Sequence, residues 1–158
     1  MSWLIRAARP GDEALVLSFI RDLAAYEKLL DSVVASEETV RAGLFCPNPR
    51  IFCDIAEEGG EPAGFALWFY NYSTFVARHG IYLEDLFVRP RFRGLGIGKA
   101  LLKHLAARAV AEGCGRLEWA VLDWNAPSIA FYESLGAVAM KEWCIYRLAG
   151  EALRKLAG

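Results

Sequence analysis

Histidine, cysteine and any surplus of charge are scarce in this sequence. It holds two histidines and four cysteines among 158 residues. No Cys-x-x-Cys pair occurs and only two histidines are present, so we expect neither a zinc site nor another metal site. Eighteen Lys and Arg side chains nearly balance nineteen Asp and Glu side chains, which leaves a formal net charge of −1. This balance argues against a nucleic-acid-binding protein, because such proteins usually carry a strong basic excess.

Long apolar runs are absent as well. The longest nearly unbroken one, from Ala63 to Tyr70, is far shorter than the roughly 18 residues of a membrane span. Residues 1–6 contain no long apolar stretch of the kind that a signal peptide requires. Scattered free cysteines without such a leader are typical of a reducing compartment. We therefore expect a cytoplasmic protein that binds neither a membrane nor nucleic acid.

Hydrophobic residues, in contrast, are plentiful. They make up 55% of the chain, and aromatic residues make up 13%. A chain of this length can bury roughly 70% of the surface that its unfolded form exposes, so it can form a core without disulfide bonds. No repeat, linker or low-complexity segment interrupts the sequence. We therefore predict a single domain over residues 1–158.

Hydrophobic periodicity predicts a mixed order of strands and helices. The expected strands are at residues 3–7, 51–56, 62–70, 80–88, 117–121 and 138–148. The expected helices are at residues 12–30, 36–45, 98–112 and 127–134. Ser36 is expected to cap the second helix, and Pro47 to prevent its continuation. This order predicts an α/β fold with a mixed sheet rather than a doubly wound parallel sheet.

The most informative stretch is the glycine-rich turn Arg91-Phe92-Arg93-Gly94-Leu95-Gly96-Ile97-Gly98-Lys99. Its glycines allow positive φ and leave the backbone amides uncovered. Amides at a helix N-terminus attract an anion, so we infer a phosphate or pyrophosphate site. A P-loop is excluded because Arg93 and Ala100 stand where it needs a glycine and a Ser or Thr. A dinucleotide fingerprint is excluded because Lys99 stands where it needs a third glycine.

The turn and a second motif together resemble the GNAT superfamily of N-acyltransferases. Leu83-Glu84-Asp85-Leu86-Phe87-Val88 looks like the fourth strand of that family. Asn125-Ala126-Pro127-Ser128-Ile129-Ala130-Phe131-Tyr132-Glu133-Ser134-Leu135-Gly136-Ala137 is similar to its Asn-x-x-Ala-x-x-Phe-Tyr-x-x-Gly-Phe segment, with Ala137 in place of the last Phe. Nearly the whole chain resembles the spermidine/spermine and thialysine N-acetyltransferase group. Three further segments carry that closer resemblance: Leu23-Ala24-Ala25-Tyr26-Glu27-Lys28, Tyr82-Leu83-Glu84-Asp85 and Asp123-Trp124-Asn125-Ala126-Pro127-Ser128.

The resemblance implies a GNAT-type fold, a cosubstrate and a set of site residues. The fold is a mixed, mostly antiparallel twisted sheet that is flanked by helices and splayed between its fourth and fifth strands. The cosubstrate is acetyl-CoA, the second substrate is a small-molecule amine, and the protein is a homodimer. The implied coenzyme contacts are Leu86, Phe87, Val88, Arg93, Gly94, Leu95, Gly96, Ile97, Gly98, Lys99, Asn125, Ser128 and Tyr132. The implied acceptor contacts are Tyr26, Glu27, Glu84 and Asp85.

Acetyl transfer to an amine requires two proton movements. The amine is protonated at neutral pH, with a pKa near ~10, and must lose a proton before it attacks. Glu84 is an acid in an otherwise apolar strand, and we predict that it is the base, acting directly or through water. The resemblance makes Tyr132 the acid that protonates the departing thiolate. Asp85 should lie on the opposite face from Glu84 unless a bulge intervenes, and either a structural or a direct role fits it.

The absence of an acidic segment limits the size and charge of the expected acceptor amine. Polyamine enzymes of the group carry Asp-Pro-Trp before the fourth strand, whereas this chain reads Asn71-Tyr72-Ser73-Thr74-Phe75. The acceptor can be a polyamine, a diamine or an ω-amino acid such as a lysine analogue. The absence of the acidic residue favours an acceptor that is smaller than a long polycation. Arg78 and His79 are then candidates to contact a substrate carboxylate. The alternatives are an acetyltransferase of protein or peptide amines and a non-catalytic CoA-binding sensor, and the presence of both Glu84 and Tyr132 argues against the sensor.

Overall fold

The computed structural model describes residues 3–158 of the chain. These residues belong to two compact units, Met1–Ala120 and Val121–Gly158. The first unit holds every strand of the described residues, and the second holds two helices joined by irregular chain. No helix in residues 3–158 is both long enough and apolar enough to cross a membrane. The expected single domain therefore stays a prediction.

One five-stranded sheet runs through the first unit in the order of the chain. Its strands are β1 (Trp3–Ala7), β2 (Phe52–Glu58), β3 (Glu61–Ser73), β4 (Arg78–Val88) and β5 (Leu117–Trp119). Neighbouring strands are antiparallel except for β4 and β5, which are parallel. The mixed sheet that the order of elements predicts is thus confirmed, and so is the mostly antiparallel arrangement that the resemblance implies.

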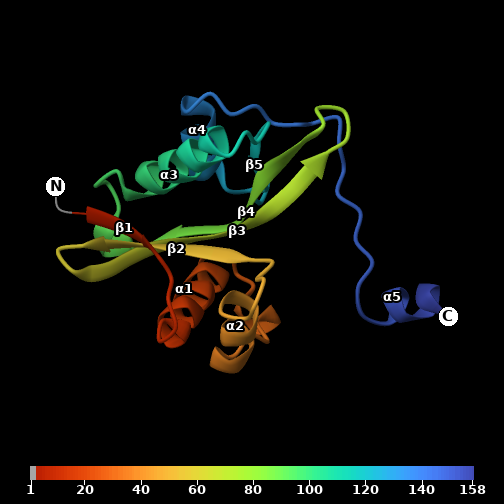
Figure 1. Cartoon of the computed structure of the whole chain (residues 1–158), viewed down its shortest axis with the longest axis horizontal. Helices are drawn as coiled ribbons and strands as arrows, with labels where there is room; N and C mark the ends of the chain where they lie inside the picture. The colour runs from red at the N-terminus through yellow and green to blue at the C-terminus, as the bar shows by residue number, and fades with distance from the viewer. Residues whose placement is uncertain (1–2) are drawn as a thin grey trace. The chain divides into compact units, whose positions relative to one another are not determined.

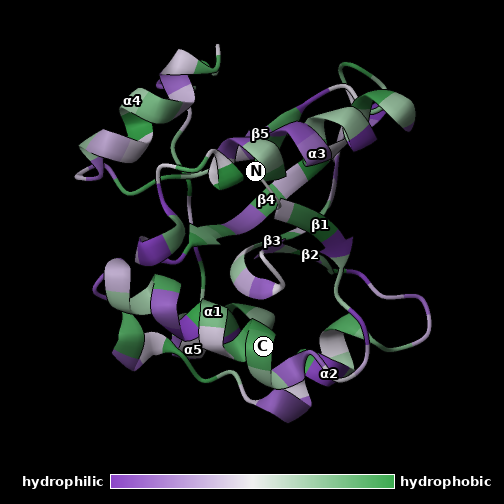
Figure 2. Cartoon of the chain, turned by 90° about the vertical axis from the view of Figure 1, so that its left-hand side faces the viewer, coloured by the Kyte–Doolittle hydropathy of each residue, from purple (hydrophilic) through white to green (hydrophobic). Residues whose placement is uncertain are grey.

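Helices cover both faces of this sheet. In the first unit they are α1 (Glu13–Tyr26), the short 3-10 helix η1 (Leu30–Ser32), α2 (Glu37–Leu44), the 3-10 turn η2 (Pro90–Phe92) and α3 (Ile97–Ala111). Helices α1 and α2 lie on one face, and α3 lies on the other (Figure 1). Hydrophobic and hydrophilic residues alternate along α3, as expected for a helix that has one buried and one exposed side (Figure 2). The second unit holds α4 (Ala126–Ser134) and α5 (Gly150–Ala157).

Local sequence explains where the helices α1 and α2 begin and end. The Ser36 side chain accepts from the backbone N–H of Thr39, and Thr39 returns the contact, which is the capping box of α2. Helix α1 ends at Tyr26, earlier than predicted, because Lys28 adopts a positive φ of 61°. The N–H of Leu29 then bonds to the carbonyl of Ala24, which completes a Schellman motif.

One part of the hydrophobic core lies between the sheet and the helices α1 and α2. The Phe19 ring of α1 stacks on the Phe65 ring of β3 with their centroids 5.1 Å apart. The buried core cluster on this side consists of Val16, Leu17, Phe19, Leu23, Val40, Leu44, Cys53, Ile55, Phe65, Leu67 and Phe87. Because Phe87 of β4 belongs to this cluster, the core fixes the strand that carries Glu84 and Asp85 against the end of α1.

A buried carboxylate connects the sheet to α3 on its other face. Asp54 of β2 is 3% exposed, and its Oδ2 accepts a hydrogen bond of 2.9 Å from Trp68 Nε1 of β3. His104 Nε2 of α3 lies 3.5 Å from Asp54 Oδ1. Arg108 of α3 also stacks over the Trp68 ring, 5.3 Å from its centroid. These contacts fix the position of α3, and therefore of the glycine-rich turn that precedes it.

The structure corrects two expectations near the end of the chain. Residues 138–148 were expected to form a final strand, but no strand or helix occurs there. The side chains of this segment are exposed instead, with Ile145 at 78% and Tyr146 at 95%. The fifth strand is also shorter than expected and ends at Trp119. Helix α5, which the sequence analysis did not predict, follows the exposed segment.

The fourth and fifth strands separate soon after they pair. Their register joins Ile81 to Leu117 and Leu83 to Trp119, and there it ends. Strand β4 continues to Val88 with β3 on one edge, while its other edge has no partner strand within the first unit. The splay implied by the resemblance is therefore present, and the backbone of residues 84–88 lines it.

Candidate active site

A β-bulge positions the two acidic residues of β4. Leu83 pairs with Trp68 of β3, and Asp85 pairs with the adjacent Leu67, so Glu84 is an extra residue without a partner. A bulge interrupts strand alternation, so consecutive side chains need not point to opposite faces. Asp85 shares its cross-strand position with Leu67, which belongs to the core beside α1. The bulge thus brings this carboxylate to the face that carries the end of α1.

Three carboxylates gather at this bulge. Glu84 is exposed, whereas Asp85 is half-buried. Burial, together with the negative charges of Glu84 and Glu27, raises the pKa of Asp85 to about 7. Burial also raises the pKa of Glu27, the residue that follows α1. The site therefore offers negative charge to a cation and contains one carboxyl group that can hold a proton near neutral pH.

The end of α1 connects this acidic site to the glycine-rich turn. The Tyr26 ring lies 6.5 Å from the Phe87 ring, measured between centroids. The Arg93 guanidinium lies 5.3 Å from the centroid of each of these two rings. Arg93 Nε also donates to the carbonyl of Val88 at 2.9 Å. Arg93 thus holds the turn against both the strand and the Tyr26 side chain.

The turn itself exposes backbone donors. Gly94 and Gly96 have φ of 79° and 82°, a region that favours glycine. A Cβ at either position would meet no atom within 4 Å, so this side of the turn is open. The first N–H of α3 with a helical partner belongs to Ala100, which bonds to Gly96. The N–H groups of residues 97–99 are therefore available to an anion.

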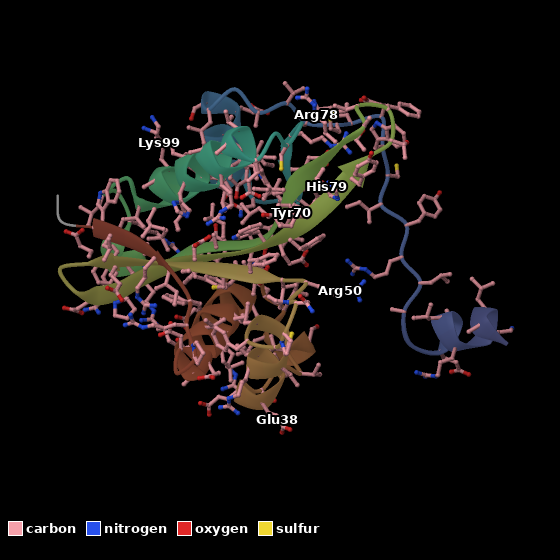
Figure 3. The ribbon with its side chains drawn as sticks, viewed as in Figure 1. Glu38, Arg50, Tyr70, Arg78, His79 and Lys99 are labelled. Carbon is pink, nitrogen blue, oxygen red and sulfur yellow. The ribbon has the colours of Figure 1, made fainter. Side chains whose placement is uncertain are left out.

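Lysine and arginine side chains surround the turn. Lys99 is exposed at the beginning of α3 and points away from the sheet (Figure 3). Arg91 forms an ion pair with Glu61. Uncovered amides together with nearby cations fit the pyrophosphate of a coenzyme, and the unpaired edge of β4 at Leu86, Phe87 and Val88 fits its extended amide-containing arm.

The second motif forms a helix of the second unit. Asn125 is 5% exposed, and its Oδ1 accepts from the backbone N–H of Ser128 at 3.3 Å, which caps α4. Tyr132 follows on the same helix, and its ring lies 5.6 Å from that of Phe131. The structure thus gathers Tyr26, Glu27, Glu84, Asp85 and the turn in one unit, and Asn125, Ser128 and Tyr132 in the other.

A polar cluster that the sequence analysis missed lies farther along β4 and β5. Asn71 Nδ2 of β3 donates to Glu118 Oε1 of β5 at 3.0 Å. Arg116 Nε lies 2.9 Å from the same oxygen. The one sequence signal near this cluster is that residues 71–75 lack the acidic segment of the polyamine enzymes. That signal alone does not reveal the cluster, because the three residues meet only through the register that places β3 and β5 on either side of β4.

His79, which the sequence suggested as a contact for a substrate carboxylate, lies elsewhere. Its ring packs against Tyr72 and Tyr70, with centroids 4.9 Å and 6.4 Å apart (Figure 3). The Tyr70 hydroxyl in turn donates to Glu112, which follows α3. His79 therefore belongs to the face that α3 covers, whereas Asp85 belongs to the face of α1.

Comparison with known proteins identifies the family. The model of the acetyltransferase (GNAT) family matches residues 20–137. A solved integron cassette protein from the mobile metagenome of V. cholerae has a TM-score of 0.82 to this chain at 32% identity, over 99% of this chain and 98% of that one. The chain therefore belongs to the GNAT family of acetyltransferases.

Two curated relatives resemble the chain over nearly its whole length. Thialysine N-epsilon-acetyltransferase of Sus scrofa is 45% identical over 168 aligned residues, which cover 99% of this chain and 98% of that protein. L-ornithine N5-acetyltransferase of Arabidopsis thaliana is 50% identical, over 96% of this chain and 86% of that protein. This protein is accordingly an acetyl-CoA-dependent N-acetyltransferase. Within residues 3–158, no group of three or more His, Cys, Asp or Glu side chains is arranged to hold a metal ion.

Proposed function

We propose that this enzyme transfers the acetyl group of acetyl-CoA to a primary amine of a small molecule such as an ω-amino acid, a diamine or a polyamine. The observation that carries the proposal is the gathering of Glu27, Glu84 and Asp85 beside the glycine-rich turn. Two relatives are named for the acetylation of thialysine and ornithine, which carry side-chain amines. An acidic site next to an anion-binding turn suits one cationic and one anionic substrate.

Residues of the turn and of β4 would hold the coenzyme. We assign its pyrophosphate to the backbone of residues 94–99 and the side chains of Arg93 and Lys99. We assign its extended arm to the open edge of residues 86–88, where the splay leaves backbone groups unpaired. Asn125 and Ser128 are proposed as further contacts. When bound, acetyl-CoA supplies the acetyl carbon that the amine attacks.

The acidic residues would bind the ammonium and remove its proton. Glu84 is exposed and therefore accessible to an arriving cation, while Tyr26 at the end of α1 can contact its alkyl part. One N–H bond of the ammonium breaks, and the proton passes to Glu84, directly or through water. Asp85 has a pKa of about 7 beside Glu84, and interacting carboxylates share their protons. We therefore propose that Glu84 and Asp85 act together as the base.

The departing thiolate needs a proton to complete the reaction. We propose that the Tyr132 hydroxyl donates it. As the C–N bond forms and the C–S bond breaks, the nitrogen gives up two protons in all, one before it attacks and one as the amide forms. The net result is one proton on the sulfur and one proton released to solvent. Tyr132 would regain its proton from solvent after product release. A positioned proton donor of this kind contributes roughly 10²- to 10⁴-fold to a rate.

A thiol-release assay with acetyl-CoA tests the proposed function. The panel should contain ornithine, lysine, thialysine, short diamines, spermidine and a peptide with a free N-terminal amine. We expect release with the small amines and little with the peptide. Release with the peptide alone would favour a protein acetyltransferase. Tight CoA binding with no release for any amine would favour a sensor.

A further inference from the structure

The face of the sheet that bears Glu84 and Asp85 continues to a second polar cluster. This distal cluster consists of Asn71, Arg116 and Glu118. The oxygen Glu118 Oε1 lies 3.0 Å from Asn71 Nδ2 and 2.9 Å from Arg116 Nε. Asn71 lies in β3, Arg116 directly precedes β5 and Glu118 lies in β5, so the three residues flank β4 within the first unit.

Tyr82 connects the distal cluster to the acidic site. It pairs with Glu118 across β4 and β5, two residues before the bulge. Burial raises the pKa of Tyr82, and the charges of both Glu84 and Glu118 raise it further. Tyr82 therefore lies between the two carboxylates, and the acidic site and the distal cluster occupy one continuous face.

Gly80 allows the distal cluster to pack close to the strand. A Cβ at residue 80 would lie 2.5 Å from Asn71 Oδ1 and 3.2 Å from Arg116 Cγ. Any larger residue at position 80 would therefore collide with Asn71, so glycine is needed there for the Asn71 and Arg116 side chains to pack against β4. Glu118 then fixes Arg116 through Nε, and the Arg116 side chain remains 44% exposed. Its terminal nitrogens have no hydrogen-bond partner among residues 3–158.

We propose that Arg116 binds the carboxylate of an α-amino acid whose distant amine is acetylated beside Glu84 and Asp85. This assignment rests on the proposed function and names the acceptor class within it. A guanidinium anchored through Nε presents a planar edge of two donors, which matches the two oxygens of a carboxylate. The face of the sheet that runs from Glu84 and Asp85 to Arg116 then has negative charge at one end and positive charge at the other. A zwitterionic ω-amino acid has the complementary arrangement, with an ammonium at one end and a carboxylate at the other.

The spacing of the two ends is compatible with such a molecule. Residues 80 and 84 of β4 lie roughly 13 Å apart along the strand, at about 3.3 Å per residue. The Glu84 and Arg116 side chains are each several ångströms long, so the proposal requires them to lean toward each other along the strand for one extended lysine to contact both. The amine and the carboxylate of lysine lie roughly 7 Å apart when its side chain is extended. A polyamine of that length would instead place its second cation against Arg116.

Matched pairs of acceptors test the role of Arg116. Ornithine and 1,4-diaminobutane share a carbon chain and differ in the carboxylate, as do lysine and 1,5-diaminopentane. For the wild type we expect a higher kcat/KM with each amino acid than with its diamine. Arg116→Gln should lower kcat/KM for the amino acids at least 10-fold, mainly through KM, and leave the diamines unchanged or improved.

Two controls separate recognition from folding and from net charge. Arg50→Gln removes the same charge from an exposed residue just before β2 and should leave both kinds of acceptor unaffected (Figure 3). Arg116→Lys keeps the charge but loses the planar edge, so it should give an intermediate loss for amino acids only. If Arg116→Gln does not fold, the Arg116→Lys variant alone provides the test.

The possible failures are distinguishable. Equal losses for amino acids and diamines in both Arg116 variants would overturn the assignment of Arg116 while leaving acetyl transfer intact. A wild-type preference for the diamines would overturn it as well. No acetylation of any amine by the wild type would overturn the proposed function, and this inference with it.

Discussion

Glu84 and Asp85 are neighbours in sequence, but their surroundings differ. The bulge leaves Glu84 exposed and puts Asp85 in a half-buried position that faces two other carboxylates. Removal from water disfavours the charged form of a carboxyl group, and nearby negative charge disfavours it again. The residue that the sequence singled out as the base therefore has a neighbour whose pKa of about 7 suits proton transfer at neutral pH.

Asp85→Asn should change how both activity and stability depend on pH. A base works when it is deprotonated, so wild-type kcat/KM should rise as pH increases through about 7. In the variant this rise should be lost or move to lower pH. The folded protein holds the Asp85 proton up to a higher pH than the unfolded chain does, so the stability linked to this group falls as pH rises towards 7.

The stability difference provides a second readout for this variant. Asparagine stays uncharged, so the Tm of Asp85→Asn relative to wild type should increase between about pH 5 and about pH 8. Thermal unfolding at several pH values measures this. A difference in Tm that stays constant would contradict the raised pKa, even if activity were lost.

Gly96→Val should weaken coenzyme binding. Residue 96 has a φ of 82°, and a β-branched side chain there is strained and covers the open side of the turn. We expect the Kd for CoA to rise at least ~10-fold, equivalent to about 1.4 kcal/mol, in a calorimetric titration. Gly60→Val is the matched control, because residue 60, in the turn between β2 and β3, has the same φ of 82° and the same open surroundings but lies outside the glycine-rich turn. Equal effects of the two substitutions would count against the turn as the pyrophosphate site.

Among the elements, α1 ends in a conformation that its sequence does not favour. Lys28 occupies the position of the Schellman motif where glycine is common, with a φ of 61°. Lys28→Gly should therefore stabilise the protein by about 0.5–1 kcal/mol, which urea unfolding would measure. Lys28→Ala keeps the strained backbone and removes only the side chain, so it should give no such gain. Stabilisation by both variants would show that the side chain, not φ, is responsible.

Elements with local signals could be predicted from the sequence. Ser36 caps α2 as expected, and Gly113 ends α3 with a φ of 71°. The bulge at Glu84 could not be predicted, because it depends on the register of β4 against β3. The same limit hid Arg116 and Asn71, which are far apart in sequence and meet only across paired strands.

At residues 138–148 the sequence predicted a strand that the structure does not contain, whereas the bulge and the distal cluster are present but were not predicted. The aromatic and β-branched residues of this segment, such as Trp143 and Ile145, have a high preference for strands. A strand also needs a neighbouring edge with which to pair its backbone, and composition does not supply one. The preference was real, but without a partner strand the segment has no regular secondary structure and its side chains are exposed.

At the scale of the whole molecule, the net charge of −1 hides an ordered distribution. Arg91, Arg93 and Lys99 surround the glycine-rich turn, whereas Glu27, Glu84 and Asp85 lie beside it. Opposite local fields suit two substrates of opposite charge without giving the protein a large overall charge. The balance that argued against nucleic acid is therefore compatible with a two-substrate enzyme.

The homodimer implied by the resemblance stays a prediction, and the exposed segment offers a way to test it. Trp143, Ile145 and Tyr146 are 73%, 78% and 95% exposed. Contiguous exposed apolar residues often mark an interface. We expect sedimentation velocity to give a dimer, and Ile145→Asp to raise its dissociation constant at least ~10-fold, since a buried charge is costly. A wild-type monomer, or a dimer that the substitution leaves intact, would contradict this interface.

The position of Arg93 has one more consequence, for the order in which the substrates bind. Its guanidinium contacts the Tyr26 ring, which we propose as an acceptor contact, and its backbone belongs to the turn that we propose for the coenzyme. A coenzyme that changes the position of Arg93 also changes the surroundings of Tyr26. The two binding equilibria are then linked, and linkage is reciprocal: each substrate alters the affinity for the other by the same factor. The affinity of the acceptor for the free enzyme would therefore differ from its affinity during turnover.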